Sequence, residues 1–168
     1  YRRSERGAFI DIYLYDSLSS GAGYAVSVAS IVDKLLENIE NNLISCDCGS
    51  ACYKCLKHHR NQYVHGVLDR FAALDLLRWG MSGKKAPDIS YDEQARLIMP
   101  LKRILAQSGC TISEEGKIIT AEIKGRKKKL TVYPAMWIEL EESDTVYVSD
   151  AYLKFAKPYA LKKILDEV

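Results

Sequence analysis

Hydrophobic and polar positions follow two different periods along the chain, and each period predicts one kind of secondary structure. Near the start, residues 8–15 are rich in β-branched and aromatic side chains, which predicts a largely buried strand. Residues 24–43 carry apolar side chains at helical spacing, so we expect an amphipathic helix whose apolar stripe faces the core. After a polar loop, the same spacing returns from about Asn61 to Trp79 and predicts a second amphipathic helix.

A change in composition separates this first part from the rest of the chain. Residues 81–89 combine glycine, lysine and proline in the manner of a linker. Ser90 and Glu93 then have the spacing of a capping box, which predicts the start of a helix. We expect Pro100 to kink this helix and Gly109 to end it.

Four short strands and a last helix complete the pattern. The strands are expected at 111–113, 118–124, 129–138 and 145–148. Asp150 is expected to cap the final helix, and Pro158 to interrupt it. The predicted fold is therefore α+β: a strand–helix–loop–helix unit at 1–80, a linker at 81–89, and an α-β-meander-α unit at 90–168.

The loop between the first two helices holds four of the chain's five cysteines. Cys46, Cys48, Cys52 and Cys55 form a C-x-C-x3-C-x2-C run, and the small residues between the two pairs let the backbone turn back. Thiols separated by one or two residues are poor disulfide partners, because their Cβ directions rarely match. Four clustered thiolates favour a tetrahedral zinc ion, with an iron–sulfur centre as the alternative. Four cysteines leave no open coordination position, so the expected role of the zinc is structural.

Two local clusters of lysine and arginine residues are candidates for nucleic-acid contact. A net charge of +2 is too small to indicate a nucleic-acid partner by itself, and no apolar run is long enough to cross a membrane. The candidate nucleic-acid-binding residues are Lys54, Lys57 and Arg60 beside the cysteines, and Lys124, Arg126, Lys127, Lys128 and Lys129 on an expected hairpin. Tyr133 and Trp137 would offer stacking faces if exposed. The alternative for both clusters is that the cationic side chains are only solvated. For the cations beside the cysteines, a further alternative is that they balance the negative charge of the zinc–thiolate cluster.

A short acidic motif offers a catalytic alternative. Glu122 and Lys124 form an E-x-K string, the second half of a restriction-endonuclease-like signature that positions Mg²⁺ and water. The motif needs a partner acid, and the nearby candidates are Glu114, Glu115 and Glu93. Because a three-residue half-motif often occurs by chance, a nuclease is the second hypothesis.

Polar residues after the cysteine loop have structural interpretations. His65 and Asp69 stand four residues apart, so on a helix they are expected to pair. Asn61 and Gln62 are expected to cap the junction between loop and helix. Cys110 stands apart from the other cysteines and is expected to be a small core residue.

Three stretches together resemble the MrfA-type zinc-binding domain, which lies near the C-terminus of some superfamily 2 DNA helicases of DNA repair and phage defence. These are L-Y-D-S-L-S-S-G-A-G-Y-A at 14–25, C-D-C-G-S-A-C-Y-K-C-L-K-H-H-R-N-Q at 46–62, and His65, Leu68, Asp69 and Arg70. The resemblance covers roughly residues 10–77, and Ser20 departs from it where a glycine is expected. It implies that Cys46, Cys48, Cys52 and Cys55 hold a structural zinc.

The resemblance also implies a function for the chain. We expect a non-catalytic C-terminal accessory module of a helicase-like DNA-processing protein, with DNA, the helicase core of the same polypeptide or a defence-complex subunit as partners. The chain begins Tyr1-Arg2-Arg3 without a methionine, so we expect a piece of a longer polypeptide with its ATPase residues upstream. Clustered thiols indicate a reducing, cytoplasmic location. The alternatives are the nuclease and a protein-interaction module.

Overall fold

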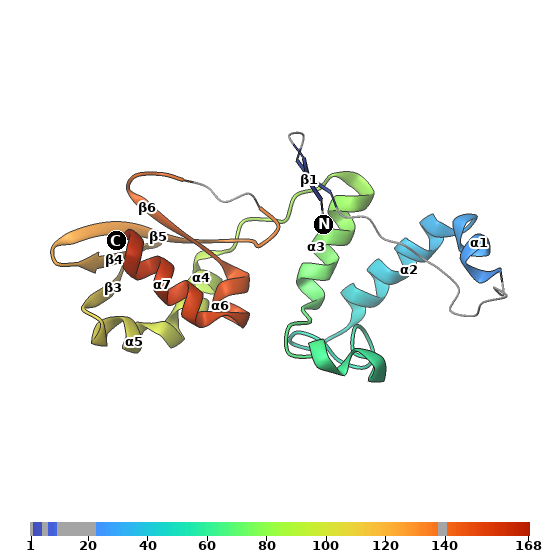
Figure 1. Cartoon of the computed structure of the whole chain (residues 1–168), viewed down its shortest axis with the longest axis horizontal. Coiled ribbons are helices and arrows are strands. Elements are labelled where there is room, and N and C mark those ends of the chain that lie inside the picture. The colour runs from blue at the N-terminus through green and yellow to red at the C-terminus, as the bar shows by residue number, and fades with distance from the viewer. Residues whose placement is uncertain (1, 5–6, 10–22, 138–140) are drawn as a thin grey trace. The chain divides into compact units, whose positions relative to one another are not determined.

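The computed structural model describes residues 2–4, 7–9, 23–137 and 141–168 (Figure 1). The chain divides into two compact units, Tyr1–Ser45 and Cys46–Val168, which are described separately below. Among the described residues, none of the helices has both the length and the apolar character that crossing a membrane requires.

The described residues of the first unit form two short paired strands and two helices. The elements are β1 (Arg2–Ser4), β2 (Gly7–Phe9), α1 (Tyr24–Ala29) and α2 (Val32–Ser45). Strands β1 and β2 pair antiparallel, with Arg3 opposite Ala8. The strand expected at 8–15 is described only as far as Phe9, where β2 ends, because residues 10–22 lie outside the described residues.

The single helix expected at 24–43 is divided in two, so this prediction was wrong in its continuity. Helix α1 ends after one and a half turns, where the Ser30 hydroxyl donates to the Ser27 carbonyl oxygen at 2.8 Å. Serine hydroxyls that bond to a nearby carbonyl compete with helix continuation. The apolar stripe is also less buried than expected: of α1 and α2, Leu43 is buried, whereas Val32 and Ile39 are exposed.

The second unit begins with the cysteine loop, a 3-10 helix η1 (His59–Val64) and helix α3 (Arg70–Ser82). The helix expected from Asn61 therefore starts nine residues later. The Asp69 side chain fixes this start, because it accepts hydrogen bonds from the backbone N–H groups of Phe71 and Ala72 at 2.9 and 3.4 Å. An aspartate in this position satisfies donors that have no partner within the first helical turn.

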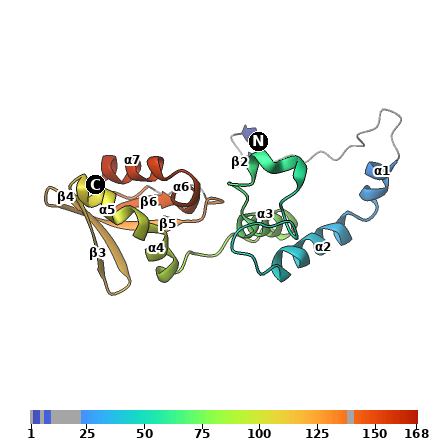
Figure 2. The same ribbon diagram turned by 90° about the horizontal axis from the view of Figure 1, so that it is seen from below.

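After α3, the described residues of the second unit form four strands, four α-helices and one 3-10 turn. In chain order they are α4 (Tyr91–Ile98), the 3-10 turn η2 (Met99–Leu101), α5 (Lys102–Gln107), β3 (Cys110–Glu115), β4 (Ile118–Ile123), β5 (Arg126–Tyr133), β6 (Thr145–Ser149), α6 (Asp150–Phe155) and α7 (Lys157–Glu167). Helices α6 and α7 run beside β6 (Figure 2). The core lies between the helices and one face of the sheet, and includes Leu105, Leu130, Val148 and Ile164. The fold class is α+β, as predicted.

The sheet follows a meander for three strands and then departs from it. Strands β3, β4 and β5 pair antiparallel in sequence order, but β6 pairs parallel to β5, with Leu130 opposite Val146. Strands β5 and β6 both place every second residue in the same core. This alternation is the same whether two strands run parallel or antiparallel, so the sequence pattern could not reveal the parallel pairing. A parallel pair requires a crossover connection, and residues 134–144 separate β5 from β6 in the sequence.

Several helix boundaries follow the predicted signals. Ser90 caps α4 by accepting from the Glu93 backbone N–H at 3.4 Å, and Gly109 ends α5 with a φ of 80°. Pro100 lies in η2, where the helical path changes from α to 3-10. The last helix is capped by Ser149 and not by Asp150, and it breaks at Ala156, before the proline at position 158.

The expected linker 81–89 lies within the second compact unit. Ala86 is buried, and the Trp137 indole N–H donates to its carbonyl oxygen at 3.0 Å. The segment is therefore fastened to the chain that follows β5. The division into domains at 1–80 and 90–168 stays a prediction.

Candidate metal centre

The four clustered cysteines bring their sulfur atoms together at the start of the second unit. All four Sγ atoms lie within 4.8 Å of one another, and the Cys46–Cys48, Cys46–Cys52, Cys48–Cys55 and Cys52–Cys55 separations are 3.5, 3.6, 3.7 and 3.9 Å. A tetrahedron of sulfurs about 2.3 Å from a central zinc ion has edges of about 3.8 Å. None of the four is in a disulfide, so all the thiols are available as ligands. The cluster is able to bind zinc.

Backbone amides inside the loop already point at the sulfurs. The N–H groups of Cys52 and Lys54 donate to the Sγ atoms of Cys55 and Cys52 at 3.3 and 3.4 Å. The Lys54 N–H lowers the pKa of the Cys52 thiol to about 7, while burial raises the pKa of the Cys48 thiol to about 12. The Lys54 amide therefore stabilises negative charge on the Cys52 sulfur, which is the form that binds a metal, whereas burial opposes it at Cys48.

A second set of contacts ties the loop to the beginning of α3. Arg70 donates from Nε to the Cys48 carbonyl oxygen and from its backbone N–H to the Ser50 carbonyl oxygen, both at 2.8 Å. The Ser50 hydroxyl in turn donates to the Leu68 carbonyl oxygen at 2.6 Å. From the sequence, Ser50 was expected only to help the loop turn as a small residue, and Arg70 entered only through the family resemblance. Nothing in the sequence shows that Arg70, fifteen residues beyond Cys55, turns back onto the loop.

The polar residues after the cysteines form a separate network. Asn61 closes a capping box with His58, as expected of a cap: its Oδ1 accepts from the His58 N–H at 2.7 Å. The His65 Nε2 lies 2.9 Å from the same Oδ1. The predicted pair between His65 and Asp69 is therefore wrong, because His65 lies before the helix and Asp69 caps it. Instead, Asp69 forms an ion pair with Lys154 at 3.0 Å.

The predicted cations beside the cysteines lie at the surface. Lys54 and Arg60 are exposed, and Lys57 is half-buried. From Gly49 to Leu68 the sequence contains no acidic residue. The loop thus combines the thiol cluster with three cations, while the exposed Asp47 between Cys46 and Cys48 is its one acidic residue.

The predicted cations of the hairpin divide between its tip and its two faces. Lys124 lies in the two-residue turn, and Arg126 opens β5 beside it. Lys127 and Lys129 occupy the face of the sheet opposite the core, and Lys127 pairs with Glu115 at 3.2 Å. Because alternate strand residues face opposite ways, Lys128 lies on the other side.

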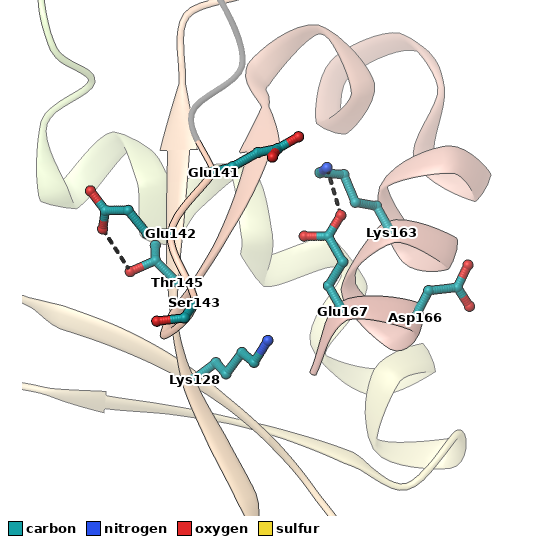
Figure 3. Close-up of a pocket in the computed structure, with 8 residues that line it drawn as sticks. All are labelled: Lys128, Glu141, Glu142, Ser143, Thr145, Lys163, Asp166 and Glu167. Atoms are coloured by element: carbon teal, nitrogen blue, oxygen red, sulfur yellow. Dashed lines mark hydrogen bonds and ion pairs between the residues drawn. The ribbon is translucent and has the colours of Figure 1, made fainter.

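Lys128 lines an open pocket of about 570 Å³ between the β5–β6 region and α7 (Figure 3). The other lining residues are Glu141, Glu142, Ser143, Thr145, Lys163, Asp166 and Glu167. Four carboxylates against two lysines make this pocket unfavourable for phosphate. Lys128 is thus the weakest of the predicted hairpin contacts.

Both aromatic residues predicted as stacking faces are at least partly buried. Tyr133 is only 7% exposed, and it forms an edge contact with Tyr147, with ring centroids 6.5 Å apart. Trp137 is half-buried, and its indole N–H is bonded to Ala86. The Tyr133 ring is therefore mostly covered, whereas Trp137 keeps part of its surface exposed. Cys110 is fully buried in the core, as predicted.

The structure does not assemble the nuclease motif. Glu122 lies in β4, whereas Lys124 has a φ of 51° in the turn that follows, so the two do not share a strand face. Of the candidate partner acids, Glu114 pairs with Lys102 and Glu115 with Lys127. Across the described part of the chain, the four cysteines are the one group with metal-ligand geometry.

Comparison with known proteins finds a zinc-binding family whose model matches the region of the cysteine loop. Residues 3–56 match the MrfA Zn-binding domain, and this range includes all four clustered cysteines. The chain is also 31% identical over 165 residues to the Druantia protein DruE of Escherichia coli (strain UMEA 4076-1). That similarity covers 94% of this chain but only 9% of the longer protein, and no solved structure matches the chain. The four-cysteine cluster therefore lies within a stretch of the chain that is similar to the MrfA Zn-binding domain.

Proposed function

We propose that this chain is the zinc-stabilised, non-catalytic accessory module of a larger helicase-like DNA-processing protein that acts in phage defence. The observation that carries the proposal is the four-sulfur cluster of tetrahedral dimensions inside the match to the MrfA Zn-binding domain. The similarity to Druantia protein DruE extends through both compact units, which supports a single module built from the whole chain.

In this proposal, Cys46, Cys48, Cys52 and Cys55 are the zinc ligands. Zinc with four sulfur ligands has a closed shell, so it holds no reactive water and acts by cross-linking the loop. When bound, the ion supplies folding free energy and no step of chemistry. The loop's thiols favour a reducing compartment, and on that ground we place the protein in the cytoplasm.

DNA is the partner that the surface charges favour. The zinc loop offers Lys54, Lys57 and Arg60, and the hairpin offers a second set of cations around Lys124 and Arg126. Cations of this kind bind phosphates without reading sequence, so binding is expected to weaken as salt rises. The helicase core of the same polypeptide, or another subunit of a defence complex, is the second expected partner.

The test measures zinc content and DNA affinity on the same purified chain. Binding of labelled DNA is followed by fluorescence anisotropy at several salt concentrations. Neutralising the hairpin by Lys124→Gln, Arg126→Gln, Lys127→Gln and Lys129→Gln should weaken binding and reduce the salt slope by roughly one per lost phosphate contact. The matched control neutralises four exposed cations elsewhere: Lys34→Gln, Arg103→Gln, Lys157→Gln and Lys162→Gln.

The outcomes separate the candidate functions. Equal loss of binding in both neutralised sets would show that only net charge matters, and would contradict hairpin contact. Absence of DNA binding would favour a protein-interaction module. Metal-dependent DNA cleavage that Glu122→Ala abolishes would establish the nuclease instead.

A further inference from the structure

Two tyrosines of the zinc loop region project into solvent. Tyr53, between the second pair of cysteines, is 69% exposed, and Tyr63, in η1, is 88% exposed. Isolated exposed apolar residues are common on protein surfaces. Here, however, both rings lie within a stretch that carries three cations and no acidic residue, from Gly49 to Leu68.

The Tyr53 ring is held in place. It contacts His65 edge to face, with ring centroids 5.6 Å apart and an interplanar angle of 85°. His65 is itself fixed by Asn61 Oδ1 at 2.9 Å and the His58 carbonyl oxygen at 3.1 Å. An edge-to-face contact leaves at least one face of the tyrosine ring uncovered by the histidine. The ring is therefore pre-positioned, and a flat ligand that stacks on it does not have to order it first.

Tyr63 is positioned by the same short segment. It lies in η1, whose first turn is closed by the capping box between His58 and Asn61. Arg60, in the same 3-10 helix, and Lys54, next to Tyr53, are both exposed. Each ring thus has a guanidinium or ammonium group close to it in the chain.

We infer that this surface, defined by Tyr53, Tyr63, Lys54, Lys57 and Arg60, binds single-stranded DNA, with the tyrosines stacking on unpaired bases. The inference rests on the proposed function and names the form of DNA. Stacking requires a free base face, and in a duplex both faces of each base are covered by neighbouring pairs. The three cations fall between the two tyrosines along the chain, and a basic surface that also carries aromatic rings is the arrangement that tracks a single-stranded backbone. The zinc–thiolate cluster has a net charge of −2 when four thiolates bind Zn²⁺, so the outer cations and not the metal would attract phosphate.

The test compares labelled oligothymidylate with a duplex of the same length, using the zinc-loaded full chain and fluorescence anisotropy. We expect tighter binding to the single strand. Tyr53→Leu and Tyr63→Leu should each weaken that binding about tenfold, because they remove the aromatic face and keep an apolar side chain of similar bulk. Tyr53→Phe and Tyr63→Phe should retain it. Tyr159→Leu on α7 is the matched control, since Tyr159 is 68% exposed and lies outside this surface.

Each outcome is decisive for the stacking surface. Single-strand binding that is unchanged in both leucine variants, with zinc content intact, would overturn the inference. If cation neutralisation still weakens binding in that case, the proposed DNA-binding function stands without it. If neither single strands nor duplex bind the wild-type chain, both the inference and the DNA-binding part of the proposed function fail.

Discussion

Each sulfur in the cysteine loop has several neighbours, so the loss of one thiol affects the whole cluster. Cys46 lies 3.5 Å from the Cys48 Sγ and 3.6 Å from the Cys52 Sγ, and it is buried. Cys46→Ser should reduce zinc content from about one ion per chain to near zero, because three sulfurs no longer complete the shell. Zinc measured by plasma emission spectrometry on the purified variant checks this.

Cys110→Ala is the control for that experiment. Cys110 is equally free and fully buried, but it lies in the core of the sheet. Its replacement should leave zinc content unchanged. A Cys46→Ser protein that retains zinc would show that the four cysteines are not the ligand set.

The carboxylate of Glu114 gives the chain a specific response to acid. Lys102 foremost, and then the Tyr91 hydroxyl, donate hydrogen bonds that lower the pKa of this carboxyl from 4.5. A lowered pKa means that the folded state stabilises the ionised form. That stabilisation is complete above the pKa of the unfolded chain and is lost as pH falls through the folded-state pKa.

Glu114→Gln should therefore lower the Tm at neutral pH and flatten the fall in Tm on acidification. Thermal unfolding followed by circular dichroism, from neutral pH down to about pH 3, measures both effects. Glu37→Gln, at an exposed position of α2, is the control because it removes the same negative charge as Glu114→Gln. Identical acid profiles for Glu114→Gln and the wild type would contradict the role of Glu114.

Sequence reasoning succeeded at residues whose role depends on local spacing. The cysteine cluster, the Asn61 cap and the buried Cys110 all follow from neighbours a few positions away. The pairing of His65 with Asp69 failed because it required both residues to lie in one helix. A one-turn spacing has meaning only after the helix boundary is known.

At the scale of elements, the β4–β5 hairpin stores strain at a single residue. Lys124 has a φ of 51° and is followed by Gly125 with a φ of 81°, so both residues of the turn have positive φ, as a type I′ turn requires. A lysine in this conformation costs about 1 kcal/mol. Lys124→Asn should relieve part of that cost and raise the Tm by a few degrees.

The corresponding change in the neighbouring hairpin is the control. Lys117 follows Gly116 in the β3–β4 turn, but its own φ is not positive. Lys117→Asn should therefore leave the Tm unchanged. Equal gains from Lys117→Asn and Lys124→Asn would show that loss of charge, and not relief of strain, is responsible.

From the sequence, the type of each element was easier to predict than the strand with which it pairs. The helices near 91–107 and the strands β3 to β5 follow from periodicity, capping residues and glycine turns. The parallel pairing of β6 did not, because its alternate apolar residues suit either direction. Helix α3 starts nine residues later than expected. The apolar residues keep helical spacing before Arg70, but the Asp69 cap sets where the helix begins.

At the scale of the second unit, the zinc loop and the sheet are connected through the beginning of α3. Arg70 binds the loop carbonyls, and the adjacent Asp69, only 7% exposed in its side chain, forms an ion pair with Lys154 of α6. Lys154 also pairs with Asp150 at 2.8 Å, and Asp150 accepts from the Ala135 N–H at the same distance. No spacing in the sequence predicted this contact across 85 residues, because it depends on tertiary packing.

This connection predicts that zinc affects the stability of α6 as well as of its own loop. Removing zinc with a chelator frees the loop, weakens the hold of Arg70 on it, and should loosen the Asp69–Lys154 pair. Amide hydrogen exchange should then increase in the cysteine loop and also in α6. In Lys154→Met the exchange of α6 should no longer respond to chelation, whereas that of the loop still should. Lys163→Met, which removes an ion pair within α7, should behave like the wild type. If α6 exchanges at the same rate with and without zinc in the wild-type chain, the metal stabilises only its own loop, and the sheet is energetically independent of it.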